Sequence, residues 1–198
     1  MESMNKIDVC PLQLLSFNAP ISLTEDVLDL VRNESWQYND NNEYSLDTFL
    51  HKRDEYKPLI QWFQQCLMQV RIEKRFMFRG DFQIVQCWAN KTTTGGSHHV
   101  HMHPNSILSG IFYLNDSTPT RFMKESKWDI PLIQSMNNEQ TSTTVQSECG
   151  KLLIFPSTLM HGTDRMINDD TRYTMSFNTF ISGELGDEQS LDYVSINR

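Results

Sequence analysis

Five of the six histidines lie in two short segments of the sequence. Residues 97–103 read SHHVHMH, and His161 follows a predicted strand that ends near residue 155. Alternate side chains of an extended segment point to one face, so His101 and His103 are expected to lie side by side, with His99 on the same face. Histidine is the commonest protein ligand for iron, zinc, copper and nickel. The spacing therefore predicts a metal site formed by His101, His103 and His161.

The ligand types limit which metal this site suits. No cysteine lies beside these histidines, and imidazole ligands, with or without a carboxylate, suit Fe(II), zinc or manganese rather than Cu(I) or an iron–sulfur cluster. Three protein ligands leave positions open for water, substrate or O₂. The competing interpretation is a solvated histidine-rich loop. The isolated His51, beside Lys52 and Arg53, is interpreted as an ordinary surface residue.

A second chemical signal is a segment with one polar face that begins with an arginine. Residues 172–180 read RYTMSFNTF, and on a strand four polar side chains would share a face: Arg172, Thr174, Ser176 and Asn178. A guanidinium is well suited to bidentate binding of a carboxylate, so this face is predicted to line a ligand site. The alternative is an arginine that pairs at a sheet edge with one of three acids: Asp164, Asp169 or Asp170.

The elements that position these residues are mostly predicted strands. Period-two runs of aromatic and β-branched residues cover 82–89, 108–115, 151–155 and 172–181, which favours a sandwich or barrel. The first third is predicted to be helical, with a capping box at Ser22–Glu25 and a longer helix from Pro58 to Val70. Residues 115–148 form a long polar excursion, interpreted as a functional loop.

Composition narrows the possible partners and location. The chain has 198 residues and a net charge of −8, which fits one domain and makes nucleic acid an unlikely partner for a sequence-independent contact. We find neither a membrane-length apolar run nor a signal-peptide pattern, so we expect a soluble cytoplasmic protein with no membrane partner. Four widely spaced cysteines are expected to be reduced and mostly buried.

Three motifs together resemble the 2-oxoglutarate- and Fe(II)-dependent oxygenases. They are HMHPNSILSGIFYLN at 101–115, GKLLIFPSTLMH at 150–161 and RYTMSFN at 172–178. Their order and spacing are similar to the first metal motif, the distal histidine and the oxoglutarate-binding arginine of prolyl-hydroxylase-like members. The details also resemble a group of oxygenases found in phage and marine bacterial genomes. The resemblance covers about residues 83–180.

This resemblance implies a mainly β fold, a double-stranded β-helix or jelly-roll at about 82–181, with flanking helices in 1–80 and a tail at 182–198, all in one domain. It implies Fe(II) bound by His101 and His161, and 2-oxoglutarate whose distal carboxylate binds Arg172, with help from Tyr113. Ser176 and Asn178 are candidates for the pocket wall. The implied reaction consumes O₂ and 2-oxoglutarate and hydroxylates a substrate, in the host cytoplasm if the protein is phage-encoded.

One position departs from the family pattern. The family usually has H-x-D or H-x-E, whereas this chain has His103 at the carboxylate position. His103 itself is the favoured third ligand. The alternatives are a carboxylate from Asp116 or Asp164, or a site with only two protein ligands.

Two other functions remain open from the sequence. A cupin-type metalloenzyme would explain part of the histidine spacing, but the glutamate expected after H-x-H is absent and Arg172 has no role in it. A non-catalytic jelly-roll module with a structural metal also leaves the arginine unexplained. The substrate is not encoded in a readable motif; a protein or peptide residue is the first hypothesis, with a small molecule as the alternative.

Overall fold

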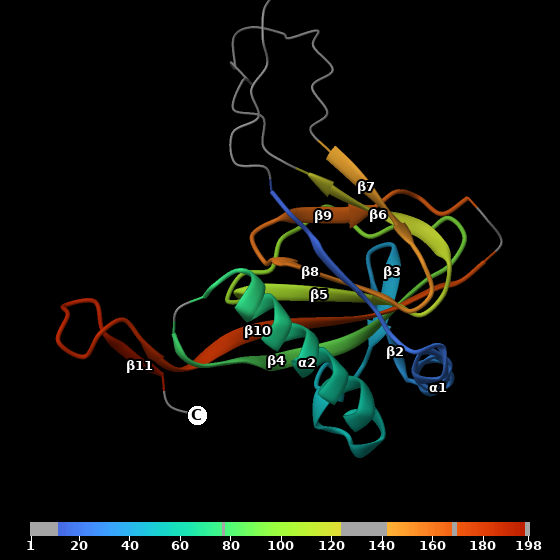
Figure 1. Ribbon diagram of the computed structural model, residues 1–198. Coiled ribbons are helices and arrows are strands. Elements are labelled where there is room, and N and C mark those ends of the chain that lie inside the picture. The colour runs from blue at the N-terminus through green and yellow to red at the C-terminus, as the bar shows by residue number, and fades with distance from the viewer. Residues whose placement is uncertain (1–11, 77, 124–141, 168–169, 197–198) are drawn as a thin grey trace, which may run out of the picture.

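The computed structural model describes residues 12–76, 78–123, 142–167 and 170–196. Within them, two antiparallel sheets form the body of the molecule (Figure 1). The larger sheet runs in the order β1 (Leu15–Asn18), β8 (Lys151–Pro156), β5 (Leu108–Tyr113), β10 (Arg172–Leu185), β4 (Arg79–Thr92), β3 (Asn42–Ser45) and β2 (Trp36–Asn39), and β11 (Val194–Ile196) pairs with β10. The smaller sheet runs β7 (Ser142–Ser147), β6 (Ser117–Met123) and β9 (Met160–Thr163).

The two sheets confirm the predicted double-stranded β-helix. All four predicted strands are present as β4, β5, β8 and β10, and each pairs with a neighbour in the larger sheet. The smaller sheet covers one face of the larger (Figure 1), so the space between them is where inward-facing side chains of both sheets meet.

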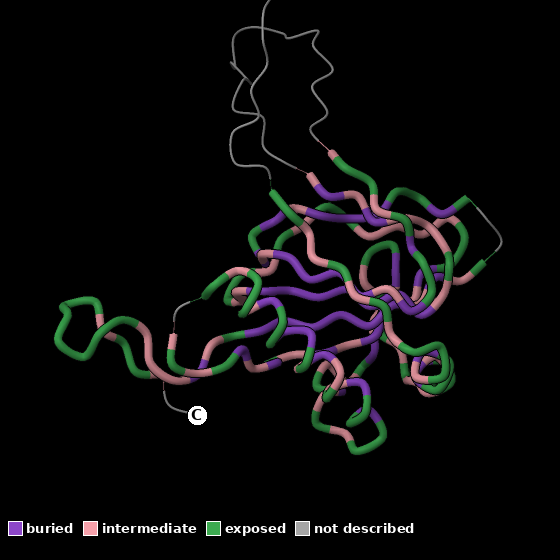
Figure 2. Tube along the Cα trace, in the orientation of Figure 1, coloured by how far each residue is buried: buried purple, intermediate pink, exposed green. Residues whose placement is uncertain are grey.

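The middle strands of the larger sheet are buried on both faces. In β5, Ile111 and Tyr113 point between the sheets, while Phe112 belongs to the core on the other face. In β8, Leu153 and Phe155 lie between the sheets and alternate with Leu152 and Ile154 in the other core. Figure 2 shows this continuous burial through the central strands. Alternation thus gives the apolar side chains of these strands a core on either face of the sheet.

The second core lies between the larger sheet and two helices, α1 (Ile21–Arg32) and α2 (Lys57–Glu73). The predicted α2 is confirmed, with proline in its first turn. Its Phe63 ring lies 5.7 Å from the ring of Phe112 and 4.7 Å from that of Phe177. This contact anchors the helix to β5 and β10, the strands that border the candidate site.

The capping-box prediction for α1 is wrong. The helix begins at Ile21, its N-cap is Pro20, and no side chain caps it. Ser22 is therefore already inside the first turn, and Thr24 instead bonds back to the Pro20 carbonyl oxygen. Proline fixes an extended backbone at the start of the helix, which sets the N-cap two residues earlier than the Ser22 motif predicts.

The largely helical interpretation of the first third is also incomplete. Strand β1 joins the larger sheet, and β2 and β3 form a hairpin within the part of the chain that was interpreted as helical. The polar excursion 115–148 contains β6 and β7, while 124–141 lie outside the described residues. These strands are short and polar, so period-two alternation gave little signal. Two short 3₁₀ turns, Leu50–Lys52 and Asp54–Tyr56, precede α2. His51 lies in the first of these turns and is not part of the histidine group of the candidate site.

The described cysteines are free thiols: Cys66 and Cys87 are buried and Cys149 is exposed. Burial raises the pKa of the Cys66 thiol to about 12, so this thiol is unreactive at neutral pH. Cys10 lies outside the described residues. Neither described helix combines the length and the apolar character that a membrane crossing requires.

Candidate metal centre

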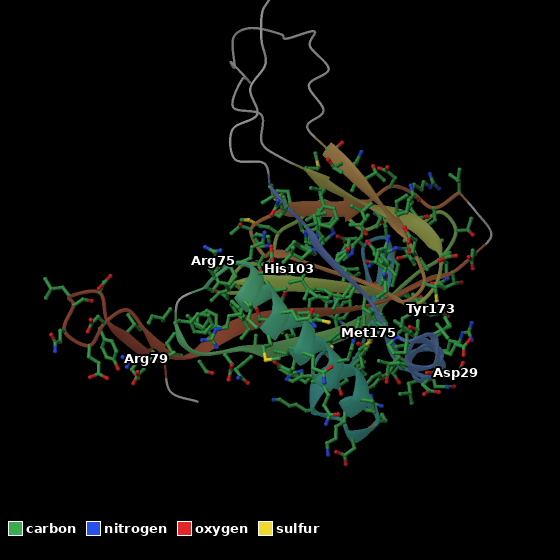
Figure 3. The ribbon with its side chains drawn as sticks, viewed as in Figure 1. Asp29, Arg75, Arg79, His103, Tyr173 and Met175 are labelled. Atoms are coloured by element: carbon green, nitrogen blue, oxygen red, sulfur yellow. The ribbon has the colours of Figure 1, made fainter. Side chains whose placement is uncertain are left out.

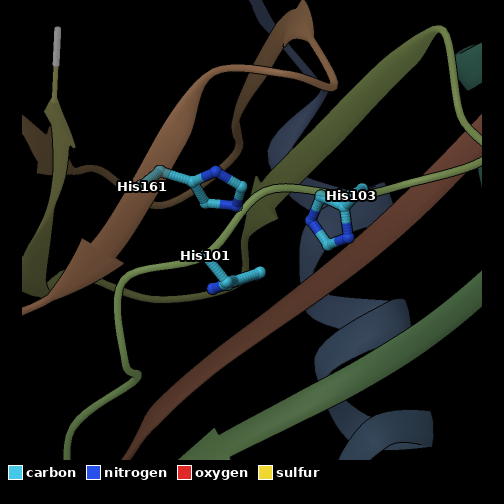
Figure 4. Close-up of side chains that lie close together, drawn as sticks. All are labelled: His101, His103 and His161. Atoms are coloured by element: carbon cyan, nitrogen blue, oxygen red, sulfur yellow. The ribbon is translucent and has the colours of Figure 1, made fainter. Parts of the chain in front are cut away.

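The structure brings His101 and His161 together by direct backbone pairing. His161 lies on β9, and its N–H donates to the His101 carbonyl oxygen at 2.9 Å while the His101 N–H donates to His161 at 2.9 Å. The His103 N–H donates to the Ser157 carbonyl oxygen at 2.9 Å. Residues that are 60 positions apart along the chain, His101 and His161, are thereby held in register, and the three rings converge (Figure 4).

The predicted strand at 97–103 is reduced to this single bridge between His101 and His161. Alternation therefore fails for His98, which was expected on the opposite face. Its ring stacks on that of His101 at 4.5 Å between centroids and lines the same cavity, whereas His99 is exposed. Gly162 allows the backbone of His98 to lie close to β9, because a Cβ at Gly162 would lie 2.9 Å from the His98 carbonyl oxygen.

The ligand atoms of the three histidines all lie within 4.8 Å of one another. The ring centroids are 4.5 Å apart for His101 and His161, 4.9 Å for His101 and His103, and 5.1 Å for His103 and His161. With metal–nitrogen bonds of about 2.1 Å, two ligand nitrogens lie at most ~4.2 Å apart. The donor set therefore fits one transition-metal cation after a small inward movement of the rings.

Hydrogen bonds orient two of the rings for metal binding. Nδ1 of His101 lies 2.9 Å from the His99 carbonyl oxygen, and Nδ1 of His161 lies 2.8 Å from that of Leu159. A carbonyl only accepts, so each Nδ1 carries the proton and each Nε2 keeps its lone pair. Such second contacts fix the tautomer of metal-binding histidines.

The surroundings also keep the imidazoles neutral. Burial lowers the pKa of His161 to about 3 and that of His103 to about 4, and it lowers the pKa of His101 as well. Neutral imidazole is the form that binds a metal. At neutral pH these rings are already uncharged, so they can bind a metal without first losing a proton.

Neither carboxylate considered as the third ligand lies free to bind. Asp116 accepts a hydrogen bond from the Cys149 backbone N–H, and Asp164 pairs with Arg121 at 3.0 Å. Among the described residues, the group able to hold a metal contains three imidazoles and no carboxylate. The geometry supports His103 over an acid at this position.

Arg172 lies at the start of β10 with only 4% of its surface exposed. Its Nε donates to the Thr118 carbonyl oxygen at 3.1 Å and its Nη2 to Thr120 Oγ1 at 3.1 Å. Burial lowers the pKa of Arg172, but an arginine in a protein remains protonated. The result is a buried positive charge held by neutral partners.

No carboxylate pairs with Arg172 among the described residues. Asp164 pairs with Arg121, and Asp170 accepts a hydrogen bond from the Thr171 backbone N–H; Asp169 lies outside the described residues. The ion-pair alternative for Arg172 thus finds no support in the described part of the chain. A buried charge without a counter-charge is costly, and a bound anion would relieve that cost.

One cavity between the two sheets joins the arginine and the imidazoles. Its lining comprises Trp88, Asn90, His98, His101, His103, Ile111, Thr120, His161, Gly162, Thr163, Arg172, Thr174 and Ser176. The predicted polar face of β10 is therefore correct for its first three members. Tyr113 and Asn178, also predicted for the pocket, lie one layer behind: Tyr113 donates to Thr120 Oγ1 at 2.7 Å, and Asn178 contacts His103.

Several lining residues were not predicted as site residues. Thr120 was missed because β6 was interpreted as part of a polar loop. Asn90 was missed because the predicted strand ended at residue 89, whereas the observed β4 continues to Thr92. Its Nδ2 donates to Ser176 Oγ at 3.0 Å and its Oδ1 accepts from the Trp88 indole at 3.1 Å. The available signal for Asn90 was alternation continued past residue 89, which places it on the same face as Trp88.

Comparison with known proteins agrees with this geometry. Residues 86–178, which include all of the predicted ligands and Arg172, match the family model described as "Putative 2OG-Fe(II) oxygenase". This segment belongs to the 2-oxoglutarate- and Fe(II)-dependent oxygenases. The family uses Fe(II) as its metal and 2-oxoglutarate as its cosubstrate, so the oxygenase assignment by resemblance is confirmed.

Solved structures share the fold of this oxygenase at low sequence identity. HygX from Streptomyces hygroscopicus, solved with nickel and 2-oxoglutarate bound, is 14% identical with a TM-score of 0.65, covering 94% of this chain and 91% of its own. A prolyl-4-hydroxylase from Pseudomonas putida is 13% identical with a TM-score of 0.61, covering 84% and 92%. A prolyl hydroxylase from Trichoplax adhaerens, bound to a peptide, is 14% identical with a TM-score of 0.57, covering 84% and 83%. No curated protein sequence matches the chain.

Proposed function

We propose that this oxygenase hydroxylates its substrate with Fe(II) held by His101, His103 and His161, and with the distal carboxylate of 2-oxoglutarate held by Arg172. One observation carries the proposal. A buried guanidinium without a carboxylate partner lines the same cavity as three converging imidazoles. An anion would balance the charge of the guanidinium, and a metal cation would accept the lone pairs of the three neutral imidazoles.

The cosubstrate and metal supply the oxidising chemistry. When both are bound, the chemistry they would supply places one atom of O₂ in a substrate C–H bond and the other in succinate, with release of CO₂. The protein contributes binding, orientation and exclusion of water. Backbone hydrogen bonds position the imidazoles. The apolar residue Ile111 lines the cavity, and the Phe155 ring packs 4.8 Å from the ring of His161.

Each proposed cosubstrate residue has a separate task. Arg172 supplies charge-assisted hydrogen bonds to the distal carboxylate. Thr120 holds Arg172, and Tyr113 lies behind both with its ring 5.5 Å from the guanidinium carbon. Ser176 lines the wall beside Thr174, where its hydroxyl can donate to the cosubstrate. Asn178 supports the wall from behind, where it contacts His103.

A protein or peptide residue is the proposed substrate class. Support comes from the structural similarity to prolyl hydroxylases, one of which was solved with a peptide. The HygX structure with hygromycin B bound represents the small-molecule alternative. A screen of peptides against aminoglycosides, with detection of a 16-dalton mass increase, separates the two classes.

The proposed function is tested by anaerobic spectroscopy. Adding 2-oxoglutarate to the Fe(II)-loaded protein is expected to produce a weak visible charge-transfer absorption, and admitting O₂ should then yield succinate. The Arg172→Ala variant should show neither at the same cosubstrate concentration. A wild-type protein that binds Fe(II) but gives no absorption with 2-oxoglutarate would favour the cupin-type alternative. A closed, inert metal site would favour the non-catalytic module.

A further inference from the structure

Asn178 is a buried amide that contacts the third histidine from behind the cavity wall. It lies on β10 with 8% of its surface exposed. Its Nδ2 is 3.5 Å from Nδ1 of His103, and its Oδ1 accepts a hydrogen bond from Ser109 Oγ at 2.8 Å. Among the described residues it is the one side chain that hydrogen-bonds to the His103 ring, which is labelled in Figure 3.

His103 therefore differs from the other two histidines in how its tautomer is set. Carbonyl oxygens fix the protons of His101 and His161 on Nδ1. An amide has one accepting end and one donating end. If the NH₂ end of Asn178 faces His103, Nδ1 must accept, and the ring proton sits on Nε2, where it blocks metal binding. If the oxygen faces His103, Nδ1 carries the proton and Nε2 is free.

A row of serine hydroxyls continues from the other end of the amide. Ser109 Oγ lies 2.8 Å from Ser157 Oγ, which lies 2.7 Å from Ser106 Oγ. Ser106 then donates to the carbonyl oxygens of Leu108 at 3.1 Å or Thr179 at 3.2 Å. Ser109 and Ser157 are 1% and 0% exposed, so water is not their alternative partner.

Counting protons along this row decides between the two amide orientations. The row contains four contacts: amide to Ser109, Ser109 to Ser157, Ser157 to Ser106, and Ser106 to a carbonyl. With the amide oxygen facing Ser109, three hydroxyl protons must serve all four contacts, and one contact lacks a proton. With the NH₂ end facing Ser109, the amide supplies the fourth proton and every contact is satisfied. Buried polar groups strongly favour full satisfaction.

We propose that Asn178 is a positioning residue whose Oδ1 accepts the Nδ1 proton of His103 and so keeps Nε2 of His103 available to the metal. A half turn of the amide produces this arrangement without moving its heavy atoms. The serine row Ser109, Ser157 and Ser106 holds the amide in that orientation. The inference rests on the proposed function, because it takes His103 to be a metal ligand.

The role follows from having histidine where the family usually has a carboxylate. A carboxylate offers lone pairs on both oxygens and has no tautomer to control. An imidazole at the same position has one lone pair and needs its other nitrogen protonated by a fixed acceptor. Asn178 pairs with Ser109 across β10 and β5, so the acceptor is built into the rigid sheet.

Metal affinity of three variants tests the inference, with Co(II) as the probe under conditions free of 2-oxoglutarate. Asn178→Asp keeps an acceptor toward His103 and should bind Co(II) within about threefold of the wild type. Asn178→Leu removes the acceptor and should weaken binding by roughly 10- to 100-fold. Asn42→Leu is the matched control, since Asn42 is a buried amide of β3 at 5% exposure outside the site, and its affinity should be unchanged.

Nitrogen-15 NMR of the histidine rings in the Zn(II)-loaded protein gives an independent readout. The wild type and Asn178→Asp should show His103 protonated on Nδ1 and metal-bound through Nε2. Equal Co(II) affinity of wild type and Asn178→Leu, equal weakening in the Asp and Leu variants, or a His103 ring protonated on Nε2 would each overturn the inference while leaving the metal site intact. A wild-type protein that binds no Co(II) would overturn the proposed function and the inference together.

Discussion

The guanidinium of Arg172 lies 5.5 Å from the ring centre of Tyr113, and both side chains donate a hydrogen bond to the same atom, Thr120 Oγ1. Because that oxygen accepts twice, the Thr120 proton is free to point toward the cavity. Strands β5, β6 and β10 each contribute one of these residues. The pocket for a carboxylate therefore exists only when both sheets are in place.

Replacing Arg172 should remove most of the affinity for 2-oxoglutarate. Losing one partner of a buried charge pair costs about 2–5 kcal/mol, which is roughly a 30- to 3,000-fold loss of affinity for Arg172→Gln. Titration calorimetry on the Co(II)-loaded protein measures it. Arg121→Gln, which removes an arginine of β6 paired with Asp164, should bind like the wild type. Unchanged affinity in Arg172→Gln would refute the assignment.

The hydroxyl of Thr120 should contribute a smaller part of the same affinity. Thr120→Val keeps the side-chain shape but loses the donor to the carboxylate and the acceptor for Arg172. A hydrogen bond to a charged group is worth about 1.5–3 kcal/mol, so a loss of at least ~10-fold is expected by the same titration. Thr118→Val is the control, because Thr118 contacts Arg172 through its backbone carbonyl alone; equal losses in both variants would argue against a specific hydroxyl.

The unpaired charge of Arg172 should also lower the stability of the ligand-free protein. Arg172→Met removes a buried cation with no carboxylate partner among the described residues, so we expect its free energy of unfolding to rise by about 1–3 kcal/mol. Urea denaturation of metal-free protein measures this. With Co(II) already present, adding 2-oxoglutarate should further stabilise the wild type and leave the stability of the variant nearly unchanged. A variant that is less stable by a similar amount would mean that the arginine is structural.

His103 should tolerate conversion to the residue that the family usually has at its position. His103→Asp restores H-x-D and should retain Co(II) binding, whereas His103→Ala should lose at least ~100-fold, more than a supporting contact costs. His51→Ala removes a histidine that lies outside the cluster and serves as the control. If His103→Ala binds as tightly as the wild type, the site has only two protein ligands.

Stability of the metal-free protein should fall as the pH drops below about 6.5. Burial lowers the folded-state pKa of His103 to about 4, of His161 to about 3 and of His98 to about 2. Above the unfolded value of ~6.5 both states are neutral and these rings contribute no pH dependence. Below it the unfolded state binds more protons, so stability is lost toward acid pH. Urea midpoints from pH 7.5 to 4.5 should show this slope, and saturating Zn(II) should raise the midpoints without moving the pH at which the loss begins; a flat profile contradicts the burial.

The sequence was informative where one signal repeated within an element. The four aromatic, β-branched strands and the helix from Pro58 were predictable because their periods persist over many residues. Arg172 and Ser176 followed from the same alternation on β10. The short strands β2, β3, β6 and β7 are polar, and pairing across the sheet rather than local propensity determines them.

The geometry of the histidine segment was not predictable from alternation. Residues 97–103 form one bridge instead of a strand, so His98 turns into the cavity and His99 away from it. The backbone pairing of His101 with His161 is a contact between distant segments. Likewise, the serine row behind His103 joins β5, the turn after β8 and the loop before β5. Only the assembled sheets bring these residues together.

The central claim is that three imidazoles hold one iron ion within reach of the Arg172 guanidinium. Crystals grown without oxygen in Fe(II) and 2-oxoglutarate, measured on both sides of the iron absorption edge, test it most directly. We predict one anomalous peak bonded to His101, His103 and His161, with the distal carboxylate of 2-oxoglutarate on Arg172 and Thr120. An iron peak elsewhere, or a carboxylate bound away from Arg172, would contradict the account.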